Sequence, residues 1–426
     1  MAQLTDDCFA GGGPLMRLDT ALAELLGRLV PVVETERVPL EQALDRILAE
    51  PLVAAIDVPR EDNSAVDGYA VYFADLDPTA DTRLPVAGRA AAGHPFGRAQ
   101  PRGSAVRIFT GAVMPTGDDG AGPDTVMMQE DCRLEGERVV IRPGIKRGAN
   151  RRAAGEDVTA GAEILAAGIR LRPQEIGLAA SIGRAELAVR RPLKVAIFST
   201  GDELAEPGGR LGPGAIYDSN RFTLGALLRQ TGAAVADLGI LPDRPDAVRL
   251  AIQVAARDHD LLITSGGVSV GEEDHVKAAV QSLGRLHFWR LAIKPGRPIA
   301  LGQIGAGART VPFIGLPGNP VAAMVTYMRV ARPLILKLMG ASDLAPEIYR
   351  VRAGFPYRKK KDRREWVRAR LVADGAGGLV AERFPKDGAG ILSSMVAADG
   401  LVELPESLTE LECGATVDFL PFAGMR

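Results

Sequence analysis

Short apolar runs alternate with segments of helical periodicity through the middle of the chain, from about residue 193 to residue 340. Continuous apolar runs of this kind predict buried strands. We place these strands at 194–199, 235–240, 261–264, 288–293, 298–301 and 311–314. Apolar residues at helical spacing, such as Leu224, Leu227 and Leu228, predict helices between and after these runs. The alternation of strands and helices indicates an open, mostly parallel sheet.

The segments on either side of this region lack such a period. Residues 57–161 contain short apolar runs separated by glycine and proline, which predicts a β-rich insertion. Residues 341–426 also contain short strand-like runs between turns of glycine and aspartate. We expect this last segment to form a small β-barrel.

The remaining residues, 15–56 and 162–192, contain patterns that predict short helices at 41–49 and 173–183. The predicted fold class is therefore α/β plus β. It is a multidomain arrangement in which the α/β domain at 193–340 is accompanied by the insertion and the C-terminal barrel.

The amino-acid composition disfavours several classes of function. A hydrophobic content of 46% and a charged content of 24% are ordinary for a soluble globular protein. A net charge of −2 and 5% aromatic residues disfavour nucleic acid as a partner. No apolar run is long enough to span a membrane, and the N-terminus lacks a signal-peptide pattern. The three cysteines are too far apart for a disulfide framework or a zinc site, so we expect a cytoplasmic protein.

The turn after the predicted strand 261–264 is rich in glycine and hydroxyl groups, with Ser265, Gly266, Gly267 and Ser269. Glycine lets a ligand approach the backbone N–H groups, and the helix start that follows favours anions. The carboxylates that end the turn, including Asp274, would repel a bare anion unless a divalent cation lay between them. The turn therefore indicates a phosphorylated ligand held with Mg²⁺, although such turns also serve as plain tight connections.

Five carboxylates, Asp274 among them, and a run of cationic residues suggest the same chemistry. The carboxylates occupy turns marked by glycine or proline: Asp67, Asp157, Glu203, Asp243 and Asp274. Turns that leave the carboxyl ends of parallel strands meet at one rim, where ligands bind, so we expect Glu203, Asp243 and Asp274 to lie near one another. Arg290, Lys294 and Arg297 could bind phosphate or another oxyanion there. The alternative for each of these residues is a turn-capping or solvated side chain.

At this point the motifs match, in order from about residue 15 to the C-terminus, those of a known family. The matching segments are NSAVDGYAV at 63–71, STGDEL at 199–204, TSGGVSVGEED at 264–274, IKPGRP at 293–298 and GLPGNP at 315–320. The chain thus resembles the molybdopterin molybdenumtransferases, the family that contains bacterial MoeA and the gephyrin E-domain.

The resemblance implies a reaction and a set of partners. Molybdate would be inserted into the dithiolene of adenylylated molybdopterin with Mg²⁺-dependent loss of AMP, which yields molybdenum cofactor. Residues 15–56 and 162–192 would form a discontinuous N-terminal linker or dimerisation domain, with 15–35 also able to pack on the α/β domain. The subunits would form a homodimer in which the insertion of one faces the nucleotide-binding-like, molybdopterin-binding α/β domain (193–340) of the other. A molybdopterin adenylyltransferase would supply the substrate, and apo-molybdoenzymes or cofactor-delivery proteins would receive the product.

The resemblance also assigns roles to residues. Asp67, Asp157, Glu203, Asp243 and Asp274 would be catalytic, with Glu203 and Asp274 as Mg²⁺ ligands. Substrate contacts would come from the following residues: Thr110, Ser265, Gly266, Gly267, Ser269, Arg290, Lys294, Pro317, Pro320, Arg364 and Ser394. In the C-terminal segment, the neighbouring Arg363 and Ser393 fit the pattern as well as Arg364 and Ser394 do.

Three alternatives remain open at this stage. A molybdopterin adenylyltransferase would resemble only the 193–340 domain, and the insertion and C-terminal segment disfavour it. A paralogue specific for tungstate would carry the same motifs. A non-catalytic scaffold, as in the gephyrin branch, is a different class of function.

Overall fold

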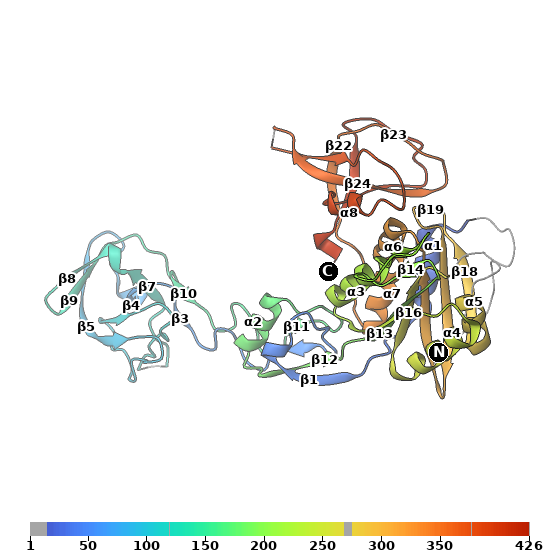
Figure 1. Ribbon diagram of the computed structural model, residues 1–426. Coiled ribbons are helices and arrows are strands. Elements are labelled where there is room, and N and C mark those ends of the chain that lie inside the picture. The colour runs from blue at the N-terminus through green and yellow to red at the C-terminus, as the bar shows by residue number, and fades with distance from the viewer. Residues whose placement is uncertain (1–14, 119, 268–274, 376, 426) are drawn as a thin grey trace.

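The computed structural model describes residues 15–118, 120–267, 275–375 and 377–425. An α/β domain and a C-terminal barrel lie against each other, and a separate β-rich domain lies at the far end of the molecule (Figure 1). A small linking domain connects the two parts.

A six-stranded sheet forms the α/β domain, with the strand order β16-β13-β17-β21-β20-β18. The bounds are β13 Lys194–Thr200, β16 Ala234–Leu241, β17 Leu261–Ser265, β18 Gly284–Arg290, β20 Pro298–Ala306 and β21 Arg309–Leu316. The first four strands in the sheet order are parallel, whereas β20 and β18 run antiparallel to their neighbours. The expected mostly parallel sheet is therefore confirmed.

Apolar side chains of the strands point alternately to the two faces of this sheet, and helices cover both faces. The helices are α3 Asn220–Thr231, α4 Pro245–Asp258, α5 His275–Leu283, α6 Pro320–Thr326 and α7 Arg332–Met339. Val195 and Ile197 of β13 pack in one apolar core with α3, α6 and α7. Ala196 and Phe198 face the opposite core with α4 and α5. The helix expected after the last predicted strand of this region is present, but the π-helical turn Tyr327–Ala331 separates α6 from α7.

The C-terminal strands close into a barrel. Its strands are β22 Tyr349–Ala353, β24 Arg364–Ala373, β25 Leu379–Arg383, β26 Gly400–Leu404 and β28 Thr416–Pro421. Pairing of β24 with β26 completes the circle, which confirms the expected small barrel. A short strand from the α/β segment, β19 (Ile293–Lys294), pairs parallel with β24. Backbone hydrogen bonding therefore joins the barrel directly to the α/β domain.

The insertion forms a six-stranded sheet of its own, with the order β7-β4-β6-β5-β9-β8. The bounds are β4 Gly68–Val71, β5 Thr82–Ala90, β6 Ala105–Ile108, β7 Thr125–Met128, β8 Cys132–Glu135 and β9 Arg138–Ile141. Two further short strands, β3 (Asn63–Ser64) and β10 (Arg151–Arg152), pair at its base. Two small apolar cores, one on each face of the sheet, hold the insertion together.

The linking domain contains two short strand pairs and one helix. Strand β1 (Thr35–Pro39) pairs with β12 (Glu186–Arg190), and β2 (Leu52–Val53) pairs with β11 (Glu163–Leu165). Helix α2 (Pro173–Ser181) begins at a proline, as the sequence predicts.

The helix predicted at 41–49 is wrong. Only a single 3₁₀ turn forms, at Leu40–Gln42. Beyond it, the backbone N–H of Asp45 donates to the Leu171 carbonyl at 2.8 Å, and that of Leu48 donates to the Ile169 carbonyl at 2.9 Å. These bonds to a distant segment take the place of the helical bonds that the local pattern predicted.

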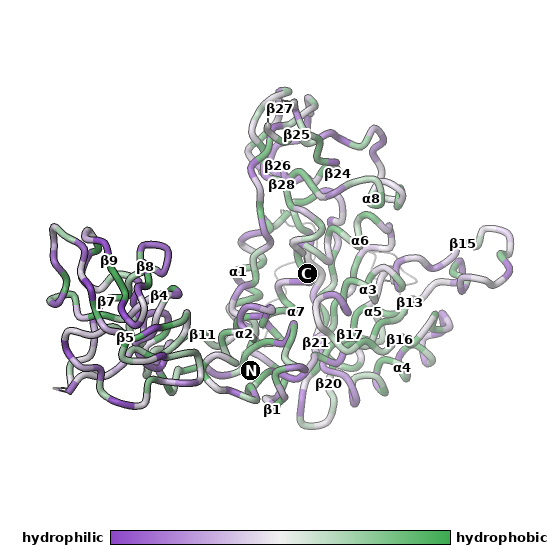
Figure 2. Tube along the Cα trace, turned by 90° about the vertical axis from the view of Figure 1, so that its left-hand side faces the viewer, coloured by the Kyte–Doolittle hydropathy of each residue, from purple (hydrophilic) through white to green (hydrophobic). Residues whose placement is uncertain are grey.

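Helix α1 (Leu18–Arg28) packs on the α/β domain rather than within the linking domain. Leu18, Ala21 and Leu25 belong to the same apolar core as α7. Near α3, a loop between the short strands β14 (Leu204–Ala205) and β15 (Ile216–Tyr217) projects away from the body (Figure 2). Among the described residues, no helix is long and apolar enough to cross a membrane.

Candidate functional site

A cavity of about 510 Å³ lies between the α/β domain and the barrel. The α/β domain contributes the turns that follow β17 and β21 and the segment around β19. The barrel contributes the start of β24 and residues 387–389. The cavity therefore lies at the carboxyl ends of the parallel strands β17 and β21, where open α/β sheets bind ligands.

Glycine allows the turns at this rim to pack closely. Gly267 has a φ of +63°, and a Cβ placed there would lie 2.6 Å from Oγ1 of Thr200, at the end of β13. A Cβ on Gly296 would lie 2.2 Å from Oγ1 of Thr326 in α6. Side chains at these two positions would force the turns apart. Glycine at these two positions thus allows the turns at the rim to approach their neighbours closely.

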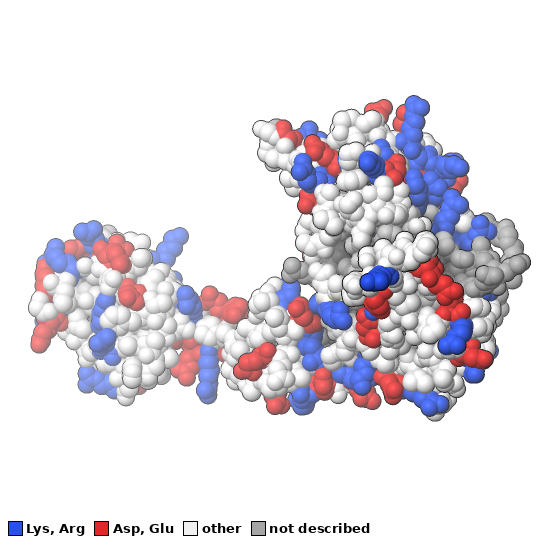
Figure 3. Space-filling view, viewed as in Figure 1, with Lys and Arg blue, Asp and Glu red and all other residues white. Residues whose placement is uncertain are grey.

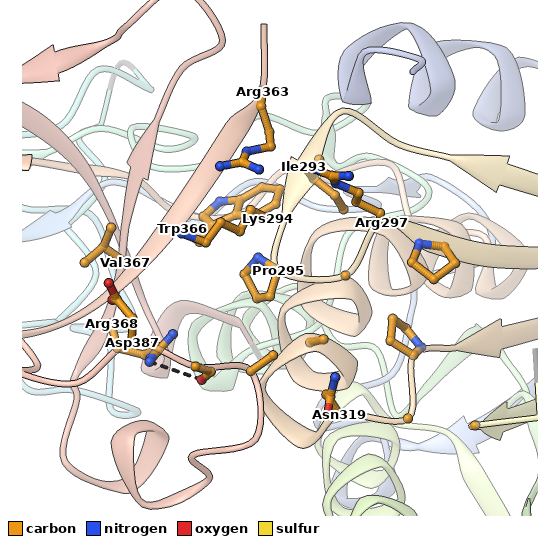
Figure 4. A pocket seen from close by; sticks show the side chains of 18 of the residues that line it. Ile293, Lys294, Pro295, Arg297, Asn319, Arg363, Trp366, Val367, Arg368 and Asp387 are labelled. Carbon is orange, nitrogen blue, oxygen red and sulfur yellow. Dashed lines mark hydrogen bonds between the residues drawn. The ribbon is translucent and has the colours of Figure 1, made fainter. Parts of the chain in front are cut away.

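Positive charge dominates the wall of the cavity. Lys294 and Arg297 come from the α/β side, and Arg363 and Arg368 come from the barrel side, while Asp387 is the one carboxylate among the described lining residues. Figure 4 shows these side chains around the cavity. In Figure 3, basic side chains gather where the barrel borders the α/β domain. A concave site with this charge balance favours an anionic ligand.

Arg368 is held in place by the barrel itself. It is 7% exposed, and its Nε donates to Oγ of Ser394 at 3.0 Å, while its Nη2 donates to the Lys386 carbonyl at 3.0 Å. Burial lowers the pKa of Arg368, but the ordinary pKa of arginine is so high that the group stays charged. Ser394, which the resemblance assigned to substrate, contacts Arg368 and does not line the cavity.

The structure brings some of the predicted site residues to the cavity. Gly266, Gly267, Lys294 and Pro317 line it. Ser265 lies behind the wall, where its hydroxyl donates to the Pro317 carbonyl at 3.1 Å. Ser269 and Asp274 lie outside the described residues.

Other predicted residues do not line the cavity. Pro320 begins α6, and Arg290 ends β18 with an exposed side chain. Glu203 and Asp243 follow β13 and β16 but do not line the cavity either. Within the described part of the chain, no group of three or more potential metal ligands occurs.

Arg364 points away from the cavity. Its guanidinium lies 2.6 Å from a carboxylate oxygen of Asp19 in α1, 3.2 Å from Glu406 and 3.4 Å from Glu403. Its neighbour Arg363 lines the cavity instead. Tyr357, Trp366, Arg368 and Asp387 also line the cavity, and the sequence analysis did not select them. The run 358–370 contains too many cations for spacing alone to distinguish the lining ones.

Asp67, Asp157 and Thr110 lie in or beside the insertion, which is remote from the cavity of the same chain (Figure 1). One oxygen of Asp67 accepts hydrogen bonds from both the backbone N–H and the hydroxyl of Thr110, each at 2.8 Å. These bonds, the backbone one foremost, hold the pKa of Asp67 below its usual range. The carboxylate is therefore kept ionised on an exposed surface.

Replacing Thr110 by valine should raise the pKa of Asp67 toward its usual value, because the hydroxyl donor is lost while the backbone donor remains. A carboxyl-carbon NMR titration of the two proteins measures this change directly. Thr110→Ser, which keeps the hydroxyl, is the matched control and should leave the pKa low. An unchanged pKa in Thr110→Val would mean that the hydroxyl does not stabilise the ionised form.

Comparison with known proteins adds independent information. Three family models match successive parts of the chain: the MoeA N-terminal region (domain I and II) at residues 16–183, a probable molybdopterin binding domain at 196–337 and the MoeA C-terminal region (domain IV) at 350–422. A molybdopterin molybdenumtransferase of Haemophilus influenzae is 39% identical over 410 residues, which cover 96% of this chain and 99% of that protein.

Further relatives agree with this match. A protein of the same name from Nostoc sp. is 37% identical over 93% of this chain and 91% of its own length. The crystal structure of a molybdopterin biosynthesis moeA protein from Pyrococcus horikoshii OT3 superposes with a TM-score of 0.83 at 26% identity, covering 96% of this chain and 100% of that one. The chain therefore belongs to the MoeA family of molybdopterin molybdenumtransferases.

Proposed function

We propose that this protein inserts molybdenum from molybdate into adenylylated molybdopterin, breaks the phosphoanhydride bond of that substrate and releases AMP. The observation that carries the proposal is the cationic cavity at the carboxyl ends of β17 and β21. Molybdate is a dianion and the adenylylated pterin carries a pyrophosphate, so both substrates require positive charge. The names of the relatives support the same reaction.

The residues that line the cavity would bind both substrates. Gly266 and Gly267 expose backbone beside the cavity, where a phosphate group could approach. Lys294 and Arg368 present donors from opposite sides, and these would bind and orient the molybdate oxygens. Bringing the oxyanion and the pterin sulfurs together in a cavity also limits the access of water.

Mg²⁺ belongs to the proposal as a bound cofactor. Glu203 is exposed beside the rim, and its carboxylate folds over Gly201, where a Cβ would lie 2.5 Å from Oε2. One or two carboxylates completed by substrate phosphates are a typical Mg²⁺ environment, and Glu203 would supply one such carboxylate. Asp274, the second predicted ligand, lies outside the described residues. Such an ion supplies charge neutralisation at the pyrophosphate.

The proposal also includes a homodimer. Asp67, Thr110 and Asp157 lie far from the cavity of their own chain, so they would serve the cavity of a second subunit. A molybdopterin adenylyltransferase would supply the substrate, and apo-molybdoenzymes or delivery proteins would take the product. The dithiolene sulfurs suit a reducing compartment, so we place the reaction in the cytoplasm.

The test is AMP release from adenylylated molybdopterin by the purified protein with Mg²⁺, with and without micromolar molybdate. We expect release to depend on molybdate, and we expect Glu203→Ala to lower the rate by about a hundredfold or more. ATP-dependent adenylylation of molybdopterin would point to an adenylyltransferase, and release only with tungstate would point to a tungstate paralogue. Tight substrate binding without any release would favour a non-catalytic scaffold.

A further inference from the structure

Glu365 is a buried carboxylate that lies directly behind the wall of the cavity. It is 1% exposed and does not line the cavity, yet it contacts three residues that do: Lys294, Tyr357 and Arg363. A buried charge is costly unless it is paired and hydrogen-bonded. Among the described residues, the hydrogen-bond and ion-pair partners of this carboxylate all line the candidate site.

The contacts divide between the two carboxylate oxygens. Oε2 accepts a hydrogen bond from the hydroxyl of Tyr357 at 3.1 Å and lies 3.3 Å from Nζ of Lys294. Oε1 accepts from Nε of Arg363 at 2.9 Å, and Nη2 of Arg363 also bonds to it. The two oxygens therefore orient one cation from the α/β side and one from the barrel side.

The backbone brings these groups together. Lys294 of β19 and Glu365 of β24 are register partners in the parallel pairing of these strands. The Arg364 backbone N–H donates to the Ala292 carbonyl at 2.8 Å next to this pair. The ion pair is thus built at the strand junction that joins the barrel to the α/β domain, and both domains contribute to it.

Free lysine and arginine side chains have many rotamers, and fixing them in one rotamer costs conformational entropy. In a cavity with four cations, mutual repulsion would also turn these side chains toward solvent. The side chain of Lys294 is 46% exposed, so it can turn toward solvent. A negative charge behind the wall opposes both effects before any ligand arrives.

On these grounds we propose that Glu365 is a positioning residue, which holds Lys294 and Arg363 at the cavity wall so that they meet the oxyanion in a preset geometry. This role rests on the proposed function, and it adds a group that touches no substrate. Tyr357 completes the arrangement by filling the remaining hydrogen-bonding position on Oε2.

The titration of Lys294 supports this arrangement. Burial disfavours the ammonium form, but Tyr357 and Glu365 outweigh it and raise the pKa of Lys294 above its usual value. Besides Arg363, three further cations lie close to this group among the described residues: Lys359 interacts with the charge of Glu365, Arg368 interacts with Tyr357, and Arg383 lies over the Tyr357 ring at 5.0 Å. Loss of the Glu365 charge should therefore lower the pKa of Lys294.

The test compares wild type with Glu365→Gln, which keeps the size and the acceptor of Glu365 but removes its charge. We expect kcat for molybdate-dependent AMP release to fall by about 10- to 100-fold, the usual cost of losing a group that orients a functional residue. The KM for the adenylylated pterin should change by less than about threefold, since its own contacts remain. Glu410→Gln, which removes an exposed carboxylate of the same barrel, is the matched control and should behave as wild type.

A second measurement is independent of the transferase reaction. The pH dependence of amine labelling at Lys294, read by mass spectrometry, gives the pKa of that group in each folded protein, and this pKa should be lower in Glu365→Gln. An unchanged pKa together with an unchanged kcat would overturn the positioning role. Failure of wild type to release AMP would refute the proposed function, while the labelling result would still decide the role of Glu365. If Glu365→Gln does not fold, Glu365→Asp keeps the charge at a shorter reach, and the same role requires a lower kcat.

Discussion

Replacing Lys294 by methionine is expected to lower kcat/KM for molybdate-dependent AMP release by about two to three orders of magnitude, the usual cost of removing one charged or hydrogen-bonding group at a reacting oxyanion. Methionine keeps most of the apolar stem, so packing against the cavity wall changes little. The ammonium is the part that is lost, and with it goes one of the two cations that Glu365 orients. The measurement is steady-state AMP release over a range of molybdate concentrations.

The control for this experiment is Arg370→Met. Arg370 lies on the same strand as Glu365, and its side chain is 62% exposed and makes a long 3.5 Å ion pair with Glu382. It lies outside the cavity lining, so its loss should leave the rate near that of wild type. If Lys294→Met kept wild-type kcat/KM for molybdate, the cavity could not be the oxyanion site that we propose.

The second large effect concerns stability. We expect Arg364→Met to reduce the free energy of unfolding by about 3–5 kcal/mol, because it removes one partner from a buried group of charges. Arg364 is 9% exposed, and Glu406 is 8% exposed at 3.2 Å from it. Glu403, which also accepts from the indole N–H of Trp366 at 2.8 Å, would keep Arg329 as its cation. Asp19 is mostly exposed, so its loss of a partner adds little.

Urea unfolding followed by circular dichroism measures this difference. Arg358→Met is the matched control, because Arg358 forms an ion pair with Glu410 at 3.0 Å on the surface of the same barrel. Exposed pairs of this kind contribute about 0–1 kcal/mol. Equal losses in the two variants would show that burial and the contact with α1 do not distinguish Arg364.

The extent to which the sequence predicts this structure differs between the domains. Buried parallel strands are continuous apolar runs, so the α/β alternation was readable from local pattern, and the turns that carry Gly267 and Lys294 followed from it. The helix expected at 41–49 failed because the N–H groups of Asp45 and Leu48 bond to residues near 170, which no local period reveals.

The sequence did not show which residues of the C-terminal segment line the cavity. Arg363 and Arg364 are adjacent and chemically alike, and what separates them is a partner 345 positions away, Asp19, which binds Arg364. The sequence did not indicate a role for Glu365 either, because that role depends on its register partner in β19. Whether the predicted residues act in the reaction as assigned stays a prediction that the variants above address.

The pairing of β19 with β24 has a consequence for how the protein is made. Strand β19 leaves the ribosome well before β24, so for part of synthesis the α/β domain carries half of the cavity with its edge unpaired. Lys294 and the glycine turns are then present without Arg363, Arg368 or Glu365. A nascent chain cannot assemble the complete cationic cavity until the barrel has folded onto the α/β domain. The binding of an anionic ligand in this cavity therefore has to follow the synthesis of the barrel strands.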